Sequence, residues 1–231
     1  MMDFNRYTDT YRDHVAAALR LPGCDNDLFL AAKGEHLLKL LGTVMGETSK
    51  LKILDVGCGI GLMEGHLARA GAMIVGVDVA VDAVRIAIQA APDASFASYD
   101  GRHLPFSEGA FDAAVAVCVL HHVEPDHWLA FFQEMARVVR PGGVVAVYEH
   151  NPWNPATRIV VSRCEFDRDA TLLSARTVTR LLHEARLERP RRQFLFFFPW
   201  MGRVWRAIED HLGWLPIGAQ YVALAIRGEQ E

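Results

Sequence analysis

Short apolar runs alternate along this chain with longer segments in which apolar residues recur every three or four positions. The short runs are typical of strands buried in a parallel sheet, and the longer period is typical of helices with one buried face. The predicted strands are 52–57, 73–78, 95–99, 111–118, 144–149, 191–198 and 220–227, and the predicted helices are 27–45, 62–70, 82–91, 127–139 and 174–186. The alternation predicts the α/β class, with a seven-stranded sheet covered by helices on both faces.

Three regions follow one another in what we expect to be a single domain, 1–231. Residues 1–50 are expected to form an N-terminal helical cap, 51–150 a ligand-binding half, and 151–231 a substrate-side half. An amphipathic, turn-rich insert at 199–219 separates the last two predicted strands in place of a short crossover helix. The closing strands are therefore expected to pair antiparallel.

Three glycines stand between the first predicted strand and the helix after it, in the stretch LDVGCGIG. A dinucleotide-binding loop has G-x-G-x-x-G spacing, but the position of its third glycine is held here by Leu62. This spacing argues against an NAD-dependent reductase, which stays as an alternative. Asp55 inside the first strand and Asp78 at the end of the second suit S-adenosylmethionine instead.

Four motifs appear in order: LDVGCGIG, VGVDVA, YDGRHLPFSEGAFDAAVAVCVLHHV and RVVRPGGVVAVYEH. With them the chain resembles the class I S-adenosylmethionine-dependent methyltransferases over about residues 50 to 150. The resemblance implies a Rossmann-like, mostly parallel sheet whose last strand is antiparallel. It also implies S-adenosyl-L-methionine as the cofactor and S-adenosyl-L-homocysteine as the product.

The resemblance further implies a role for each cofactor-binding position. The glycines would pack under the methionine part with Asp55 near its amino end, Asp78 would bind both ribose hydroxyls, and Asp100 with the Gly101 backbone would take the adenine amino group. Carboxylates suit such contacts, because charge-assisted hydrogen bonds are short and directional. A purely structural alternative makes the glycines a tight turn and the aspartates helix caps. The full predicted set is Asp55, Gly57, Cys58, Gly59, Gly61, Asp78, Val79, Asp100, Gly101, Cys118, Tyr11 and Lys33.

Tyr11 and Lys33 belong to that set because the N-terminal segment of similar methyltransferases closes over the cofactor. Alternatively, Tyr11 lies on a helix face that packs against the core, and Lys33 is a solvated charge.

Polar residues that follow the fourth and fifth predicted strands are the candidates for catalysis. A base is needed only where the acceptor must lose a proton. His150 is the first choice, Glu149 would orient it or bind substrate, and His122 is a third candidate whose alternative role is to bond a loop backbone. No metal site is predicted, because no two of these residues have metal-ligand spacing.

Composition and charge limit the kinds of partner and compartment that we expect for this protein. The net charge of −4 makes nucleic acid an unlikely partner, and the four scattered cysteines suggest neither disulfides nor a zinc knuckle. No apolar run approaches a transmembrane length, and the N-terminal residues are charged, so a cytoplasmic monomer or homodimer without stable membrane insertion is expected.

Methyl transfer to an oxygen or nitrogen of a small molecule is the leading functional hypothesis. A carbon methyltransferase of quinone or lipid biosynthesis would share the motifs and could use the aromatic residues of the insert. A non-catalytic protein that binds S-adenosylmethionine is a further alternative. Among the aromatic residues, Phe194, Phe196 and Phe198 are expected to alternate along a core strand.

Overall fold

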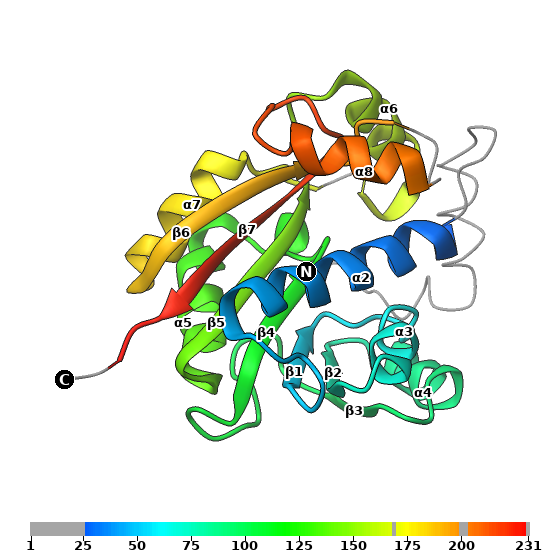
Figure 1. Cartoon of the computed structure of the whole chain (residues 1–231). Coiled ribbons are helices and arrows are strands. Elements are labelled where there is room, and N and C mark those ends of the chain that lie inside the picture. Colours follow the sequence, from blue (N-terminus) through cyan, green and yellow to red (C-terminus); the bar gives the residue numbers. More distant parts are fainter. Residues whose placement is uncertain (1–25, 168–169, 199–202, 230–231) are drawn as a thin grey trace.

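The computed structural model describes residues 26–167, 170–198 and 203–229 (Figure 1). Its sheet has the strand order β3-β2-β1-β4-β5-β7-β6. β7 runs antiparallel to both β5 and β6, and the other pairs are parallel, which confirms the predicted α/β class and its antiparallel last strand. The strands are β1 Lys52–Val56, β2 Met73–Asp78, β3 Ser95–Ser98, β4 Phe111–Val117, β5 Val139–His150, β6 Leu187–Leu195 and β7 Gln220–Arg227.

Helices cover both faces of the sheet (Figure 1). Leu37 and Leu41 of α2 share one core cluster with Ile53 of β1, and Phe132 of α5 and Leu182 of α7 share another with β5 residues. Strands with two buried faces explain the continuous apolar runs of the sequence. The helices are α2 Asn26–Met45, α3 Glu64–Arg69, α4 Val81–Ala90, α5 Trp128–Val138, α6 Pro155–Arg163, α7 Ala175–Glu184 and α8 Arg203–Leu212, with short turns η2 Leu120–His122, η3 Pro125–His127 and η4 Glu165–Asp167.

β5 begins at Val139, five residues earlier than predicted. The pairing of β4 with β5 shifts register between Phe111 and Ala113, so the Pro141-Gly142-Gly143 stretch lies inside the strand. A Cβ on Gly143 would lie 2.4 Å from the Asp112 carbonyl oxygen, so only glycine fits there. Pro and Gly are common turn residues, so the sequence predicts a strand only from residue 144.

β6 ends at Leu195, and the predicted alternation of Phe194, Phe196 and Phe198 along one strand is wrong. Phe196 has a φ of +60° and its ring packs 5.0 Å from that of Phe29, in a different core cluster from Phe194. The turn after Leu195 therefore breaks the two-residue period.

α6 was not predicted, because the Asn151-Pro-Trp-Asn-Pro stretch reads as a break. Asn154 caps this helix by accepting a hydrogen bond from the Thr157 N–H at 3.0 Å, and Pro155 occupies its first turn. Asn151 donates from its side chain to the carbonyl oxygens of Pro216 and Gly218. The Asn154 side chain also donates to the Ile217 carbonyl oxygen, so both asparagines tie the start of α6 to the segment after α8.

Residues 1–25 and 199–202 lie outside the described residues, so the predictions for Tyr11 and for part of the insert lie there too. Within the described ranges, no helix has the length and apolar character needed to cross a membrane.

Candidate functional site

The predicted site residues lie where the strands of the parallel part of the sheet end. The glycine loop follows β1, Asp78 ends β2, Asp100 follows β3, Cys118 follows β4 and His150 ends β5. Ligands of open α/β sheets bind at these carboxyl ends, so the topology brings the residues to one edge.

The glycine loop adopts a backbone that side chains disfavour. Gly57, Gly59 and Gly61 have φ values of +84°, +54° and +76°. A Cβ on Gly57 would lie 2.4 Å from Cγ2 of Val119, and one on Gly61 would lie 2.9 Å from Cα of Ala87. Among the described residues, a Cβ on Gly59 meets nothing within 4 Å. Packing within the protein therefore requires the outer two glycines, whereas the middle one borders open space.

Asp78 is bound to the backbone at both of its carboxylate oxygens. Oδ2 accepts from the Gly59 N–H and Oδ1 from the Ala80 N–H, each at 2.8 Å. Burial raises the pKa of Asp78, although these N–H groups stabilise its charged form. Because each carboxylate oxygen accepts two hydrogen bonds, both oxygens can still take a ligand hydroxyl.

Glu64, at the start of α3, was assigned no role from the sequence, yet it is fully buried beside Asp55. Within the described part of the chain, Oδ1 of Asp55 and both carboxylate oxygens of Glu64 have no hydrogen-bond partner of normal geometry, although the backbone N–H groups of Met63 and Glu64 lie near enough to lower the pKa of Glu64 in part. Burial, reinforced by Glu64, raises the pKa of Asp55, and burial raises that of Glu64 to about 7. In the sequence, only the presence of an acidic residue in the first turn of a short helix marked this position.

Glu64→Gln is expected to stabilise the ligand-free protein by about 2 kcal/mol at about pH 8. A carboxyl whose pKa rises from 4.5 to about 7 on folding lowers the free energy of unfolding as pH rises through that window. Ionising Glu64 in the folded protein costs about 3 kcal/mol of stability, and the variant avoids this cost. The net gain is smaller because the variant buries an amide. Urea unfolding at about pH 5 and about pH 8 measures the difference, which should shrink at the lower pH.

Glu134→Gln is the matched control, since the ion pair of Glu134 with Arg137 at 2.8 Å lowers the pKa of this carboxyl. Its substitution should not stabilise the protein at either pH. A Glu64→Gln gain that is the same at both pH values would contradict the buried ionisation.

Asp100 is exposed and accepts hydrogen bonds at Oδ1 from the N–H groups of Arg102 and His103, at 2.8 and 2.7 Å. These bonds lower the pKa of Asp100, and Gly101 beside it has a φ of +79°. Asp100 thus stabilises a local turn, and it does not cap a helix as the structural alternative expected. Val79 and Cys58 are half-buried, and burial raises the pKa of the Cys58 thiol.

Lys33 is buried, with 6% of its surface exposed, so the solvated alternative for it is wrong. Its Nζ lies 3.6 Å from the Sγ of Cys118, which has the unusual φ of +58°. Burial opposes ionisation of this thiol, but the charges of Lys33 and His150 lower its pKa to about 7. The amide of Gln220, which sequence reasoning missed, lies 3.7 Å from the same sulfur and 3.3 Å from Nδ1 of His150.

Glu149 contacts His121 and not the ring of His150. Its Oε2 is 2.6 Å from Nδ1 of His121, and its Oε1 accepts from the Leu120 N–H at 2.8 Å. Successive residues of a strand point to opposite faces, so adjacent Glu149 and His150 cannot share one side of β5. The expectation that Glu149 orients the His150 ring directly is therefore wrong.

His122 and the missed residue Asp167 complete this cluster. Nε2 of His122 lies 3.3 Å and Nε2 of His121 3.5 Å from Oδ1 of Asp167. Burial alone would lower the pKa of His121 and raise that of Asp167, but their mutual attraction, with Glu149, raises the first and lowers the second. His122 thus contacts a side chain, and not only a loop backbone.

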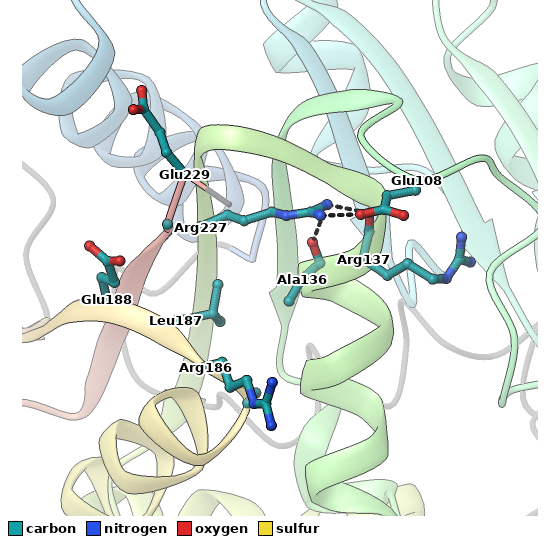
Figure 2. Close-up of a pocket in the computed structure, with 10 residues that line it drawn as sticks. Glu108, Ala136, Arg137, Arg186, Leu187, Glu188, Arg227 and Glu229 are labelled. Atoms are coloured by element: carbon teal, nitrogen blue, oxygen red, sulfur yellow. Dashed lines mark hydrogen bonds and ion pairs between the residues drawn. The ribbon is translucent and has the colours of Figure 1, made fainter. Parts of the chain in front are cut away.

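A separate cavity of about 410 Å³ lies at the opposite end of the sheet (Figure 2). There Arg227 donates to the carbonyl oxygens of Ala136, Arg137 and Val139 and pairs with Glu108. These bonds satisfy the carboxyl end of α5, so the arginine has a structural role.

Comparison with known proteins matches residues 53–143 to the family model described as a methyltransferase domain. A demethylmenaquinone methyltransferase of Beutenbergia cavernae is 37% identical over 120 residues, which cover 51% of this chain and 48% of the relative. The chain thus matches about half the length of its curated relatives.

Solved structures share the fold over nearly the whole chain. A Thermotoga maritima S-adenosylmethionine-dependent methyltransferase, described as a possible histamine N-methyltransferase, has a TM-score of 0.68 at 17% identity, covering 97% of this chain and 98% of that one. Phosphoethanolamine N-methyltransferase 2 of Haemonchus contortus, solved with S-adenosylhomocysteine, has a TM-score of 0.66 at 14% identity, covering 98% and 59%. Residues 53–143 therefore match a methyltransferase domain, and the chain shares the fold of the S-adenosylmethionine-dependent methyltransferases.

Proposed function

We propose that this protein transfers the methyl group of S-adenosylmethionine to a small-molecule acceptor. The proposal rests on the backbone at Gly59, which borders open space among the described residues and donates to Asp78. The buried carboxylates of Asp55 and Glu64, on either side of this loop in the sequence, have no hydrogen-bond partner of normal geometry within the described ranges. Burying carboxylates without partners costs free energy, which a cationic ligand relieves. S-adenosylmethionine carries both a sulfonium and an ammonium group, so it suits this site.

The residues around the loop would hold the parts of this cofactor. Asp78 accepts the ribose hydroxyls, Asp55 takes the ammonium group, and Asp100 with the Gly101 backbone takes the adenine amino group. Lys33 pairs with the cofactor carboxylate. The other residues proposed to contact the cofactor form the walls of its site, and they are Gly57, Cys58, Gly59, Gly61, Val79 and Cys118.

Bound S-adenosylmethionine supplies a methyl group on a sulfonium that is already a good leaving group. Positioning the acceptor and excluding water then supply most of the rate. His150 is the proposed base, because it is half-buried at the end of β5 and near Gln220 and Cys118. His122 is the second candidate, and Glu149 acts through His121 as a positioning residue.

An oxygen or nitrogen of a small molecule is the proposed acceptor atom, and the net charge of −4 gives no support for a nucleic-acid substrate. A carbon acceptor on a quinone is the second candidate, favoured by the demethylmenaquinone methyltransferase similarity and by Trp153 and Trp214, which are 76% and 75% exposed. A screen of hydroxyl, amine and prenylated hydroquinone acceptors separates the two. We propose that the protein acts as a monomer or homodimer.

Calorimetric titration with S-adenosylhomocysteine, S-adenosylmethionine and NADH tests the cofactor. The first two are expected to bind with dissociation constants of about 1–100 μM and NADH not to bind. Binding of NADH alone, or of none of the three, would overturn the proposal. Binding without turnover of any acceptor class would favour the non-catalytic alternative.

Gly59→Ala is expected to weaken S-adenosylhomocysteine binding at least about tenfold while the protein stays folded. The new methyl group meets no atom of the described residues within 4 Å, so it enters the space proposed for the ligand. The positive φ at position 59 costs alanine about 1 kcal/mol of stability. Calorimetry and thermal unfolding measure the two effects.

Gly46→Ala is the matched control, because Gly46 also has a positive φ of +83° and open space at its Cβ, but lies between α2 and β1. It should lose similar stability and keep full affinity. Equal affinities for the two variants would mean that the ligand does not approach Gly59.

A further inference from the structure

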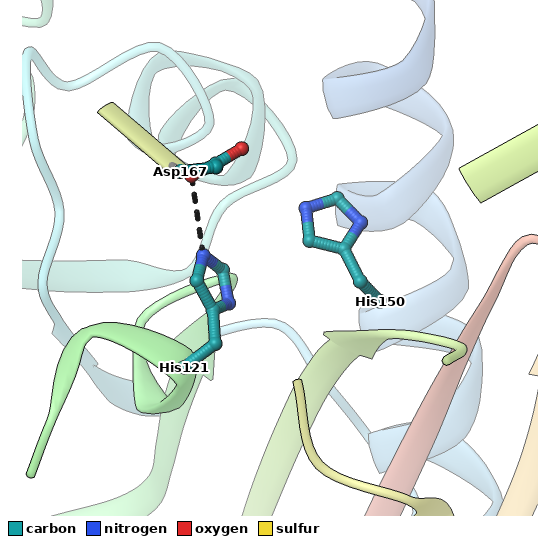
Figure 3. Close-up of side chains that lie close together, drawn as sticks. All are labelled: His121, His150 and Asp167. Atoms are coloured by element: carbon teal, nitrogen blue, oxygen red, sulfur yellow. Dashed lines mark ion pairs between the residues drawn. The ribbon is translucent and has the colours of Figure 1, made fainter. Parts of the chain in front are cut away.

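Side chains from three separate segments meet beside the proposed methyl-transfer site (Figure 3). His121 comes from η2 after β4, His150 from the end of β5, and Asp167 from η4 after α6. One potential ligand atom from each lies within 4.8 Å of those of the other two. Two imidazoles and a carboxylate therefore converge on one point.

We propose that His121, His150 and Asp167 bind a divalent transition-metal ion of the zinc type. Imidazole nitrogens and carboxylate oxygens are ligands of such ions, and three protein ligands leave a coordination position for water or an acceptor oxygen.

The spacing of His121 and Asp167 fits two ligands of one ion better than a hydrogen bond. Nε2 of His121 lies 3.5 Å from Oδ1 of Asp167. A charge-assisted hydrogen bond is about 2.7–2.9 Å long, whereas bonds of about 2.1 Å to a tetrahedral ion separate two ligands by about 3.4 Å. The ligand atoms lie up to 4.8 Å apart, so the cluster must close by up to about 1.4 Å to complete the same geometry with His150.

Neighbouring side chains hold two of the proposed metal ligands in position, as such side chains do in metal sites. Oε2 of the buried Glu149 lies 2.6 Å from Nδ1 of His121, which directs Nε2 of His121 to Asp167. A carboxylate behind a histidine is the usual support of a zinc ligand. Nε2 of His122 likewise lies 3.3 Å from the Asp167 carboxylate.

Charge balance supports a divalent ion. Glu149 and Asp167 bring two carboxylates into a largely buried cluster with the imidazoles of His121 and His122. Protonation of His121 offsets one of the two buried negative charges, whereas one divalent ion offsets both. In the metal-bound protein His150 is a ligand and not a base, so the two roles proposed for it exclude each other.

Titration of the untagged, chelator-treated full chain with Zn²⁺, in competition with a chromophoric chelator, tests the proposal. We expect one ion per chain with a dissociation constant below about 1 μM. His121→Asn and Asp167→Asn should each weaken binding at least about 100-fold, and Glu149→Gln about 10- to 100-fold. His127→Asn, which changes a half-exposed histidine in η3, should leave it unchanged.

X-ray absorption of the zinc-loaded wild-type protein makes the test independent of whether the variants fold. The expected first shell has two imidazole nitrogens, carboxylate oxygen and no sulfur. No binding tighter than that of a nonspecific surface site, a sulfur ligand from a cysteine, or an affinity unchanged in His121→Asn and Asp167→Asn would overturn the proposal. In that case His121 is an imidazolium shared between Glu149 and Asp167.

Discussion

Glu149→Ala is expected to lower the free energy of unfolding by about 3–5 kcal/mol, measured by urea unfolding in the presence of a chelator. The Glu149 side chain is fully buried, and its oxygens accept from the Leu120 N–H at 2.8 Å and contact Nδ1 of His121 at 2.6 Å. Its removal leaves these donors without a partner and leaves a cavity at the end of β5. The chelator separates this loss from any effect of a bound ion.

Two substitutions make the result interpretable. Glu149→Gln keeps the shape and one acceptor oxygen, so its loss should be smaller than that of the alanine variant. Glu124→Ala removes an exposed carboxylate that lies 3.6 Å from His127, and it should change stability by less than about 0.5 kcal/mol. A Glu149→Ala loss as small as that of Glu124→Ala would mean that the buried contact with His121 does not form.

Asp78→Ala is expected to weaken S-adenosylhomocysteine binding by about 3 kcal/mol, or about 150-fold in the dissociation constant. The proposed ribose contacts are two charge-assisted hydrogen bonds, each worth about 1.5–3 kcal/mol. The variant also loses the acceptor of the Gly59 N–H, which holds the middle of the glycine loop. Calorimetric titration well below the unfolding temperature measures the change.

Asp82→Ala is the control for charge alone, because Asp82 stands in the first turn of the neighbouring α4 and pairs on the surface with Arg85 at 2.7 Å. Its affinity should stay within about twofold of wild type, since a surface ion pair contributes little. Asp78→Asn should fall between wild type and Asp78→Ala. An Asp78→Ala protein that is folded and keeps full affinity would remove Asp78 from the ribose site.

The glycine loop and the histidine cluster lie side by side along the carboxyl ends of the parallel strands, and their polar groups are arranged differently. Around Gly59, the backbone leaves open space among the described residues, and buried carboxylates of Asp55 and Glu64 lie nearby. Around His121, Glu149 holds the imidazole ring while His150 and Asp167 approach it from other segments. The first part is suited to receive an organic cation, and the second to hold a metal ion.

Sequence alone determined the α/β class, the strands near their observed places, and the edge on which Asp55, Asp78 and Cys118 would lie. These predictions succeeded because strand and helix periods are local, and because the carboxyl ends of parallel strands always share one edge. The order of the motifs likewise sufficed for the methyltransferase resemblance, which the family match confirms.

Tertiary structure alone decided which side chains meet. It buried Glu64 beside Asp55, turned Glu149 toward His121, and brought Asp167 from η4 to the histidines. None of these pairs has a spacing that a local pattern can report, because each joins segments whose proximity depends on how the helices and turns pack over the sheet. The absence of metal-ligand spacing along the chain was therefore no guide to the convergence of His121, His150 and Asp167 in space.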